Sequence, residues 1–171
     1  MADESKTSLS QQPKAVDVST PETQNVIQCT QIRLLHSVLH PLSEEEIKTR
    51  GESGFVFKIQ AYIEDQRALS HLETEVAFID PGQECSGIFL RFGMVAEFTG
   101  AEAVSSENLA DFARFYTLPI VWPYAREYAS DQLRRAGAAF VSLPIINPQV
   151  VTETLIENDL VEVTMGGQDE K

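Results

Sequence analysis

The spacing of apolar residues changes after Gly100, and this change constrains the fold more than any other feature of the chain. Before Gly100, apolar residues tend to occupy alternate positions, most clearly along residues 55–63, where Lys58 and Gln60 occupy the other face. Alternation with a period of two is typical of strands that bury one face. After Gly100, apolar residues recur at helical spacing. We therefore predict an α+β fold in which strands come first and helices follow.

Four segments have the alternation or the β-rich composition of strands. They cover residues 27–38, 55–63, 68–79 and 86–99. The short link Asp65-Gln66-Arg67 makes the second and third segments a hairpin, and Pro81-Gly82 is a turn signal after the third. The prediction is a four-stranded antiparallel sheet, with a bulge or bend at Gly93 in its last strand.

Three helices are predicted to pack on one side of this sheet. Their ranges are 105–118, 123–136 and 147–160. Ser105 or Ser106 can cap the first helix, and Pro119 is expected to end it because proline lacks the N–H that a helix interior needs. Pro123 is expected in the first turn of the second helix, where that N–H is not required, and Gly137 is its stop signal.

The chain of 171 residues is long enough for one domain with a proper core. Residues 1–24 are polar and lack hydrophobic periodicity, so we predict a flexible N-terminal tail there. The folded domain is predicted to span residues 25–164. Residues 165–171, which include a Gly-Gly pair, are expected to be a flexible C-terminal tail.

The charge of the chain argues against a nucleic-acid partner. Asp and Glu number 26 against 13 Lys and Arg, which gives a formal net charge of -13, whereas phosphate contacts require cations. Such charge suits attraction of basic, unfolded chains and helps a protein with apolar surface to stay dispersed. No apolar run follows the N-terminus and no long apolar stretch occurs, so we expect no membrane insertion and a cytoplasmic location.

Signals for catalysis or metal binding are weak. His36 and His40 are four residues apart in or beside a predicted strand, which separates them by about 13 Å, so they should not share an ion. No P-loop, GxSxG, GxGxxG, HExxH or CxxC motif occurs. We therefore expect no catalytic, cofactor-binding or metal-binding residues and no enzymatic activity. A thiol enzyme that uses Cys85, or an acid-base enzyme, remains an open alternative.

Two runs in the second half of the chain carry a family resemblance. Residues 122–128 read Trp-Pro-Tyr-Ala-Arg-Glu-Tyr, and residues 142–147 read Ser-Leu-Pro-Ile-Ile-Asn. The first resembles the aromatic-Pro-Tyr-Ala-Arg-Glu run that opens a helix in the SecB family of protein-export chaperones. The second resembles the Leu/Pro-rich link before the last helix of that family. The similarity extends over residues 27–160 and is strongest over residues 98–147.

The resemblance implies a holdase, a chaperone that binds unfolded or precursor proteins without ATP and keeps them competent for translocation by passing them to the motor SecA. It also implies a homotetramer built as a dimer of dimers. The residues that match the client-binding groove are Phe98, Leu118, Ile120, Trp122, Leu143, Ile145 and Ile146. The helix on which the dimers meet would carry Ala125, Ala129, Leu133 and Ala136.

The chain departs from the family where SecA would dock. Family members use acidic residues of the first and fourth strands for this contact, but the matching positions here carry His36, His40 and Arg91. The family's C-terminal extension is also reduced to a short tail. An alternative is therefore a SecB-like adaptor dedicated to one partner, such as an antitoxin, without delivery to SecA.

The apolar residues of the last predicted strand have two interpretations. Phe92, Met94 and Phe98 share one face and Phe89 takes the other. They can pack as core under the helices. They can also offer adaptable apolar contact to many clients, and both interpretations can hold together.

Overall fold

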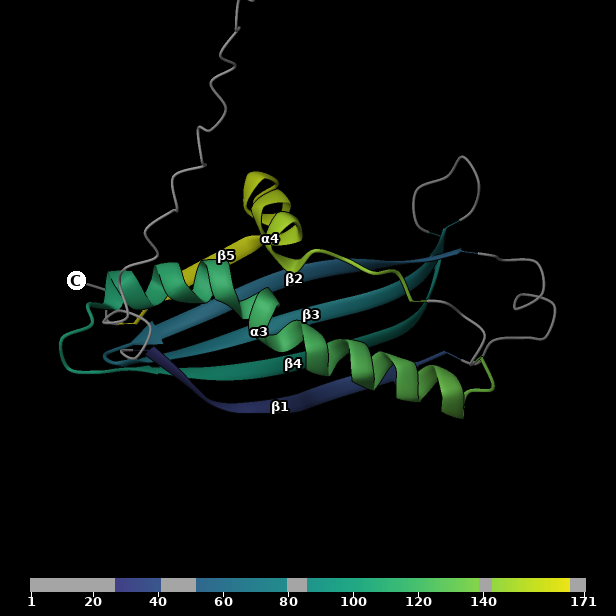
Figure 1. Cartoon of the computed structure of the whole chain (residues 1–171), viewed down its shortest axis with the longest axis horizontal. Helices are drawn as coiled ribbons and strands as arrows, with labels where there is room; N and C mark the ends of the chain where they lie inside the picture. Colours follow the sequence, from purple (N-terminus) through teal and green to yellow (C-terminus); the bar gives the residue numbers. More distant parts are fainter. Residues whose placement is uncertain (1–26, 41–51, 80–85, 139–142, 167–171) are drawn as a thin grey trace, which may run out of the picture.

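The computed structural model describes residues 27–40, 52–79, 86–138 and 143–166. The elements, in chain order, are β1 (Ile27–Leu39), β2 (Glu52–Glu64), β3 (Arg67–Ile79), β4 (Ser86–Gly100), α3 (Ser106–Arg135), α4 (Pro148–Glu157) and β5 (Val161–Met165) (Figure 1). The predicted N-terminal tail, the Pro81-Gly82 turn and most of the predicted C-terminal tail lie outside the described residues. No helix in the described ranges is long and apolar enough to cross a membrane.

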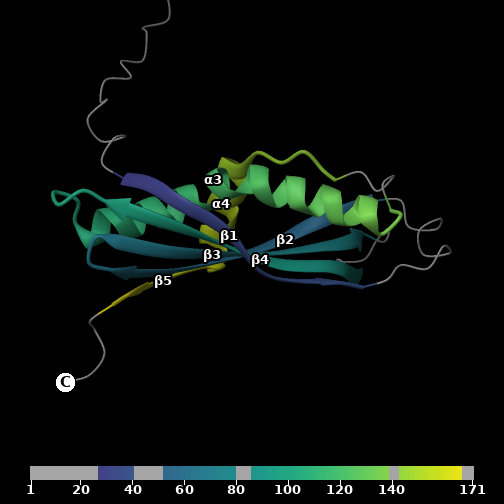
Figure 2. The ribbon, with the colours of Figure 1, turned by 90° about the horizontal axis from the view of Figure 1, so that it is seen from below.

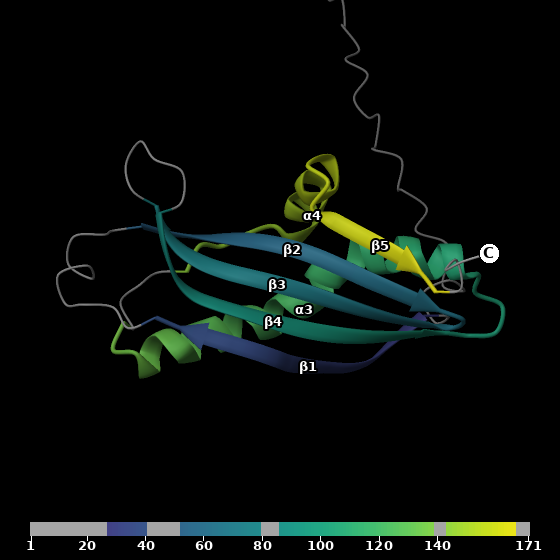
Figure 3. The same ribbon diagram turned by 180° about the vertical axis from the view of Figure 1, so that it is seen from behind.

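The strands form one mixed sheet in the order β1-β4-β3-β2-β5. Neighbouring strands are antiparallel except β5, which runs parallel to β2 with Val161 opposite Ile59 (Figure 3). The four predicted strands are present and mutually antiparallel, but the prediction lacked the fifth strand, which runs parallel to its neighbour. The missed strand has only five residues. They alternate between apolar and polar side chains, so a strand signal was present in the sequence although it was short.

The predicted β2–β3 hairpin is confirmed. Glu64 pairs with Arg67 across a two-residue turn, in which Asp65 adopts a φ of 50°, a conformation that Asp tolerates better than most residues. The irregularity expected at Gly93 lies instead in the neighbouring strand, where the register of β1 against β4 shifts between Leu34 and His36. Gly93 itself stays in register with Glu73 of β3.

The two helices predicted over residues 105–136 are one continuous helix, α3. Ser105 caps it by accepting a hydrogen bond from the backbone N–H of Asn108 at 3.1 Å. Pro119 and Pro123 both lie inside the helix, so neither ends or begins it as expected. The helix bends near its middle (Figure 1), which is the usual response to an internal proline.

The last helix is shorter than predicted. Asn147 caps α4 through its side chain, which accepts a hydrogen bond from the N–H of Gln149 at 3.1 Å. The helix ends at Glu157. Asp159 then takes a φ of 56°, and the chain turns there into β5 instead of continuing the helix to Leu160.

The core lies between the sheet and α3, which runs along one face of the sheet (Figure 2). Phe92, Met94 and Phe98 of β4 are all buried. The rings of Phe92 and Tyr128 are 5.0 Å apart, which places this side of β4 beneath α3. Phe89 is also buried and packs on Phe78. All four apolar residues of β4 that had two interpretations are therefore core.

A buried hydrogen bond joins α3 to the middle of the sheet. The hydroxyl oxygens of Ser70 on β3 and Thr117 on α3 are 2.6 Å apart, and both residues are fully buried. Thr117→Val should leave the Ser70 hydroxyl buried without this partner and lower the free energy of unfolding by about 1–3 kcal/mol. Urea denaturation measures the change.

The double variant Ser70→Ala/Thr117→Val is the matched control. Removing both hydroxyls leaves no stranded donor, so the double variant should recover part of the loss. A double variant less stable than Thr117→Val would contradict this account.

Candidate functional site

Trp122, one of the predicted groove residues, belongs to an aromatic cluster between α3 and β2. Its ring meets Phe55 and Phe57 edge to face, with centroids 4.8 and 5.5 Å apart. Trp122 is only 6% exposed. The cluster fastens the bent middle of α3 to the sheet, so the ring is part of the core in this conformation.

Three other predicted groove residues are also buried. Phe98 and Leu118 are fully enclosed, and Leu143 is nearly so. Phe98 packs edge to face on Phe112 of α3, with ring centroids 5.4 Å apart. These side chains are core residues on the helix-covered face of the sheet. A segment of a client protein could contact them only if α3 or the link after it moved.

The three remaining groove residues are accessible to different degrees. Ile120 and Ile146 are half-buried and pack against the core, whereas Ile145 is 92% exposed. Val150, in the first turn of α4, is exposed as well. The predicted set therefore divides into a buried floor and an apolar surface on the link between α3 and α4.

The predicted oligomer residues face the sheet of their own chain. Ala125, Ala129 and Leu133 are buried in the core, and Ala136 is half-buried at the C-cap of α3. The small side chains let the helix approach its own sheet closely. A contact between two copies through α3 would have to use the opposite side of the helix.

The flank of α3 that faces β1 forms a cleft with that strand, which the predictions from the sequence did not include. The cleft has a volume of about 350 Å³. Its lining residues are Ile32, Arg33, Leu34, Met94, Tyr124, Glu127, Tyr128 and Asp131. Tyr124 is 54% exposed. The sequence did contain one signal of this cleft: Tyr124 and Tyr128 are one helical turn apart and so lie on the same side of the helix.

Strand β1 adds further exposed apolar surface. It lies at one edge of the sheet, and nearly all of its residues are exposed, including Leu34, Leu35 and Val38. An uncovered edge strand of 13 residues presents unpaired backbone groups, which proteins usually cover or pair. The cleft and this edge are next to each other, since Ile32 and Leu34 belong to both.

Arg91, the position considered for motor docking, lies on the helix-free face of the sheet. Its guanidinium forms an ion pair with Glu75 on the neighbouring strand β3, with Nη2 2.5 Å from Oε1. The two residues are directly opposite each other in the β3–β4 register. The positive charge of Arg91 is thus matched by an acidic neighbour.

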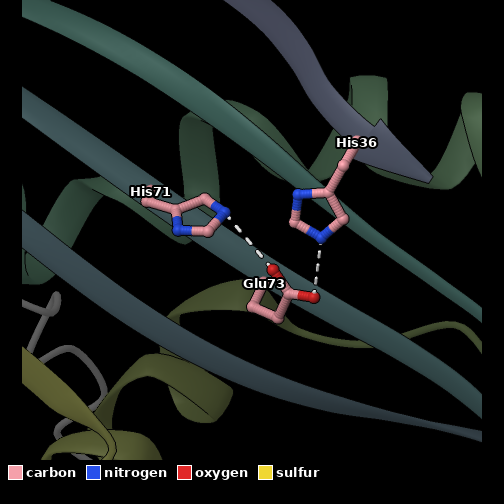
Figure 4. A group of neighbouring side chains, drawn as sticks. All are labelled: His36, His71 and Glu73. Carbon is pink, nitrogen blue, oxygen red and sulfur yellow. Dashed lines mark hydrogen bonds and ion pairs between the residues drawn. The ribbon is translucent and has the colours of Figure 1, made fainter.

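A second polar cluster lies on the same face and contains two of the three histidines. His36 Nε2 is 3.1 Å from Glu73 Oε1, and His71 Nε2 is 3.3 Å from Glu73 Oε2 (Figure 4). Burial lowers the pKa of His71 below its ordinary value, although the charge of Glu73 opposes this. These three side chains could hold a metal ion, since their ligand atoms all lie within 4.8 Å of one another.

His71 is also a candidate ligand by residue type, but only the spacing of His36 and His40 was used to judge metal binding from the sequence. His40 is exposed just beyond the end of β1 and takes no part in the cluster. The missed signal was His71-Leu72-Glu73, in which the first and third side chains share a strand face. Only strand pairing brings His36 beside them.

Cys29 gives no support to a thiol enzyme. Cys29 is exposed on β1, and partial burial of its thiol raises the pKa, whereas reactive thiols have a lowered pKa. Cys85, the candidate nucleophile, lies outside the described residues.

Trp122→Ala should destabilise the protein because it removes the ring that joins α3 to β2. We expect the free energy of unfolding to fall by about 3–5 kcal/mol, measured by urea denaturation. Tyr124→Ala, two residues along the same helix but exposed, is the control and should change stability by less than about 1 kcal/mol. Equal effects of the two substitutions would show that Trp122 is not a core residue.

Comparison with known proteins gives a likeness of structure. No protein-family model matches the chain, and no curated protein sequence matches it. The SecB-like chaperone Rv1957 of Mycobacterium tuberculosis, solved in complex with a ChAD peptide from the Rv1956 HigA1 antitoxin, is similar with a TM-score of 0.52 and 16% sequence identity. The match covers 73% of this chain and 94% of that chain. This likeness shows that the chain has the fold of the SecB-like chaperones.

Proposed function

We propose that this protein is a chaperone that holds extended, non-native segments of other proteins without using ATP. The observation that carries this proposal is the apolar surface on the link between α3 and α4. Ile145 is 92% exposed, and Val150 lies nearby and is also exposed. An isoleucine this exposed contributes little to the packing of its own chain, and clustered exposed apolar residues often mark sites of interaction.

The composition of the chain supports the same function. Its net charge of -13 attracts basic segments over a distance and limits nonspecific aggregation of a protein that exposes apolar surface. Apolar contacts from isoleucine and valine are not directional, so they tolerate clients of differing sequence. The absence of a P-loop motif from the sequence fits a chaperone that does not use ATP. We place this activity in the cytoplasm.

A second candidate is an adaptor dedicated to one partner. The SecB-like chaperone Rv1957 binds a peptide from an antitoxin, and a similar use of this fold here would not require SecA. The paired charges of Arg91 and Glu75 favour this candidate, because the acidic surface used for SecA docking is interrupted at that point. Pull-down with the full chain separates the two candidates: many unrelated proteins support a general holdase, and one stoichiometric protein supports the adaptor.

Self-association into a dimer of dimers is part of the proposal. The exposed edge of β1 and the adjoining cleft beside Tyr124 provide a surface that a second copy could cover. Covering it would pair the edge strand and remove Leu34, Leu35 and Val38 from water. In this arrangement Ala125, Ala129 and Leu133 remain core residues of each copy.

Ile145→Ser should weaken client binding without loss of stability. The side chain is almost wholly exposed, so its removal costs the folded chain little, whereas a bound apolar segment would lose the contact. We expect the protein to suppress aggregation of a reduced, unfolded client several-fold less well, as followed by light scattering.

Val56→Ser is the matched control for that substitution. Val56 is also an exposed apolar residue, but it points to the helix-free face, since its neighbours Phe55 and Phe57 pack on Trp122. It should leave suppression unchanged. Equal loss in both variants, or no suppression by the unmodified protein at excess, would refute the proposed client surface.

Tyr124→Glu should reduce the size of the assembly. A charge in the cleft beside β1 would be costly to bury between two copies, so light scattering should show a smaller mass than for the unmodified protein. Phe115→Glu changes another exposed aromatic residue of α3 outside the residues that line the cleft and should leave the mass unchanged. A monomeric unmodified protein would refute the oligomer.

A further inference from the structure

Three side chains from two non-adjacent strands converge on the helix-free face of the sheet. His36 of β1 and Glu73 of β3 are both in register with Gly93 of β4, which lies between them. His71 precedes Glu73 by two residues and therefore points to the same side of β3. Figure 4 shows the two imidazole rings turned toward the Glu73 carboxylate from opposite sides.

Gly93 makes this convergence possible. Strands separated by one intervening strand are roughly 9.5 Å apart, and the side chain of the middle strand normally fills the space between their side chains. A Cβ atom at Gly93 would lie 2.4 Å from His71 Nε2 and 2.5 Å from His36 Cε1. No side chain can therefore occupy this position while the cluster keeps its geometry.

The three donor groups are close enough together to share one metal ion after a small adjustment, because their ligand atoms all lie within 4.8 Å of one another. Ligands bonded to Zn²⁺ at about 2.0–2.1 Å are separated from one another by roughly 3.3 Å. Here His36 Nε2 is 3.1 Å from Glu73 Oε1 and His71 Nε2 is 3.3 Å from Glu73 Oε2, so each imidazole nitrogen is near that separation from a different carboxylate oxygen. His71 Nε2 is buried, and it has no hydrogen-bond partner among the described residues.

We propose that His36, His71 and Glu73 bind a divalent cation of the zinc class, with both histidines coordinating through Nε2. Two imidazoles and one carboxylate suit Zn²⁺, Ni²⁺ or Cu²⁺ better than Mg²⁺ or Ca²⁺, which need several oxygen ligands. The His36 side chain is 44% exposed, so the ion is reached from solvent and water takes the remaining coordination position.

The bound ion would fasten the edge of the sheet. β1 pairs only with β4 among the described strands, and its register shifts next to His36. An ion held by His36 on one side and by His71 and Glu73 on the other would link β1 directly to β3. Binding to the folded state then protects β1 from local opening, because the complete ligand set exists only when β1 is in place.

The test is a titration of ZnCl₂ into the full chain, prepared without an affinity tag that contains histidine and stripped with a chelator. Isothermal titration calorimetry should show one ion per chain. His36→Ala and His71→Ala should each weaken binding at least tenfold, since even residues that only support a ligand commonly contribute that much. His40→Ala removes an exposed histidine outside the cluster and should leave the affinity unchanged.

Gly93→Ala tests the geometry with all three ligands retained. The added methyl group would displace the rings, so Zn²⁺ affinity should fall here as well. Hydrogen exchange gives an independent measurement: Zn²⁺ should slow exchange of the β1 amides in the unmodified protein but not in His36→Ala.

The visible absorbance of Co²⁺ added to the unmodified protein is a further test. It uses no variant, so a variant that fails to fold cannot affect it. A visible spectrum typical of four or five ligands supports the site. Absence of that spectrum, or Zn²⁺ affinity that is the same in His36→Ala as in the unmodified protein, would overturn the proposal and leave the cluster as an ion pair alone. None of these measurements depends on client binding, so the outcome is separate from that of the proposed chaperone function.

Discussion

The packing of α3 across one face of the sheet is the contact on which the rest of this structure depends. The helix touches every strand and α4, and it buries Leu118, Val121 and Ala125 completely. Burial of a large aliphatic side chain contributes about 1.5–3 kcal/mol. Several such contacts outweigh the loss of helix hydrogen bonds at two internal prolines, each of which costs about 3 kcal/mol in a helix without tertiary support.

Because α3 covers only one face, the two sides of the sheet differ in chemistry. The link around Ile145, where we propose that clients bind, exposes apolar surface. On the helix-free side, ion pairs such as Arg91–Glu75 and Lys58–Glu162 join neighbouring strands. The histidine cluster lies on this polar side, so a cation there and a client on the link would not compete for the same atoms.

Much of the fold could be predicted from local patterns. The alternation in β2 and the two-residue link at Asp65 are properties of consecutive residues, and both the strands and the hairpin are confirmed. The helix boundaries predicted at Pro119 and Pro123 were wrong. The local cost of a proline in a helix is evident in a sequence, whereas the burial that compensates for it is not. The same limitation applies to Trp122: its aromatic character was evident, but only its contacts with Phe55 and Phe57 show that it packs in the core.

The sequence by itself determined the α+β class, the four strands that precede the helices and the resemblance to SecB-like proteins, since these follow from periodicity and from runs of adjacent residues. Only the tertiary structure decided the pairing of β5 with β2, the face of α3 that remains exposed and the meeting of His36 with His71 and Glu73. Each of these depends on the register between segments far apart in the chain. Shifting a strand by one residue turns its side chains to the other face, and no local pattern specifies which strand will be its neighbour.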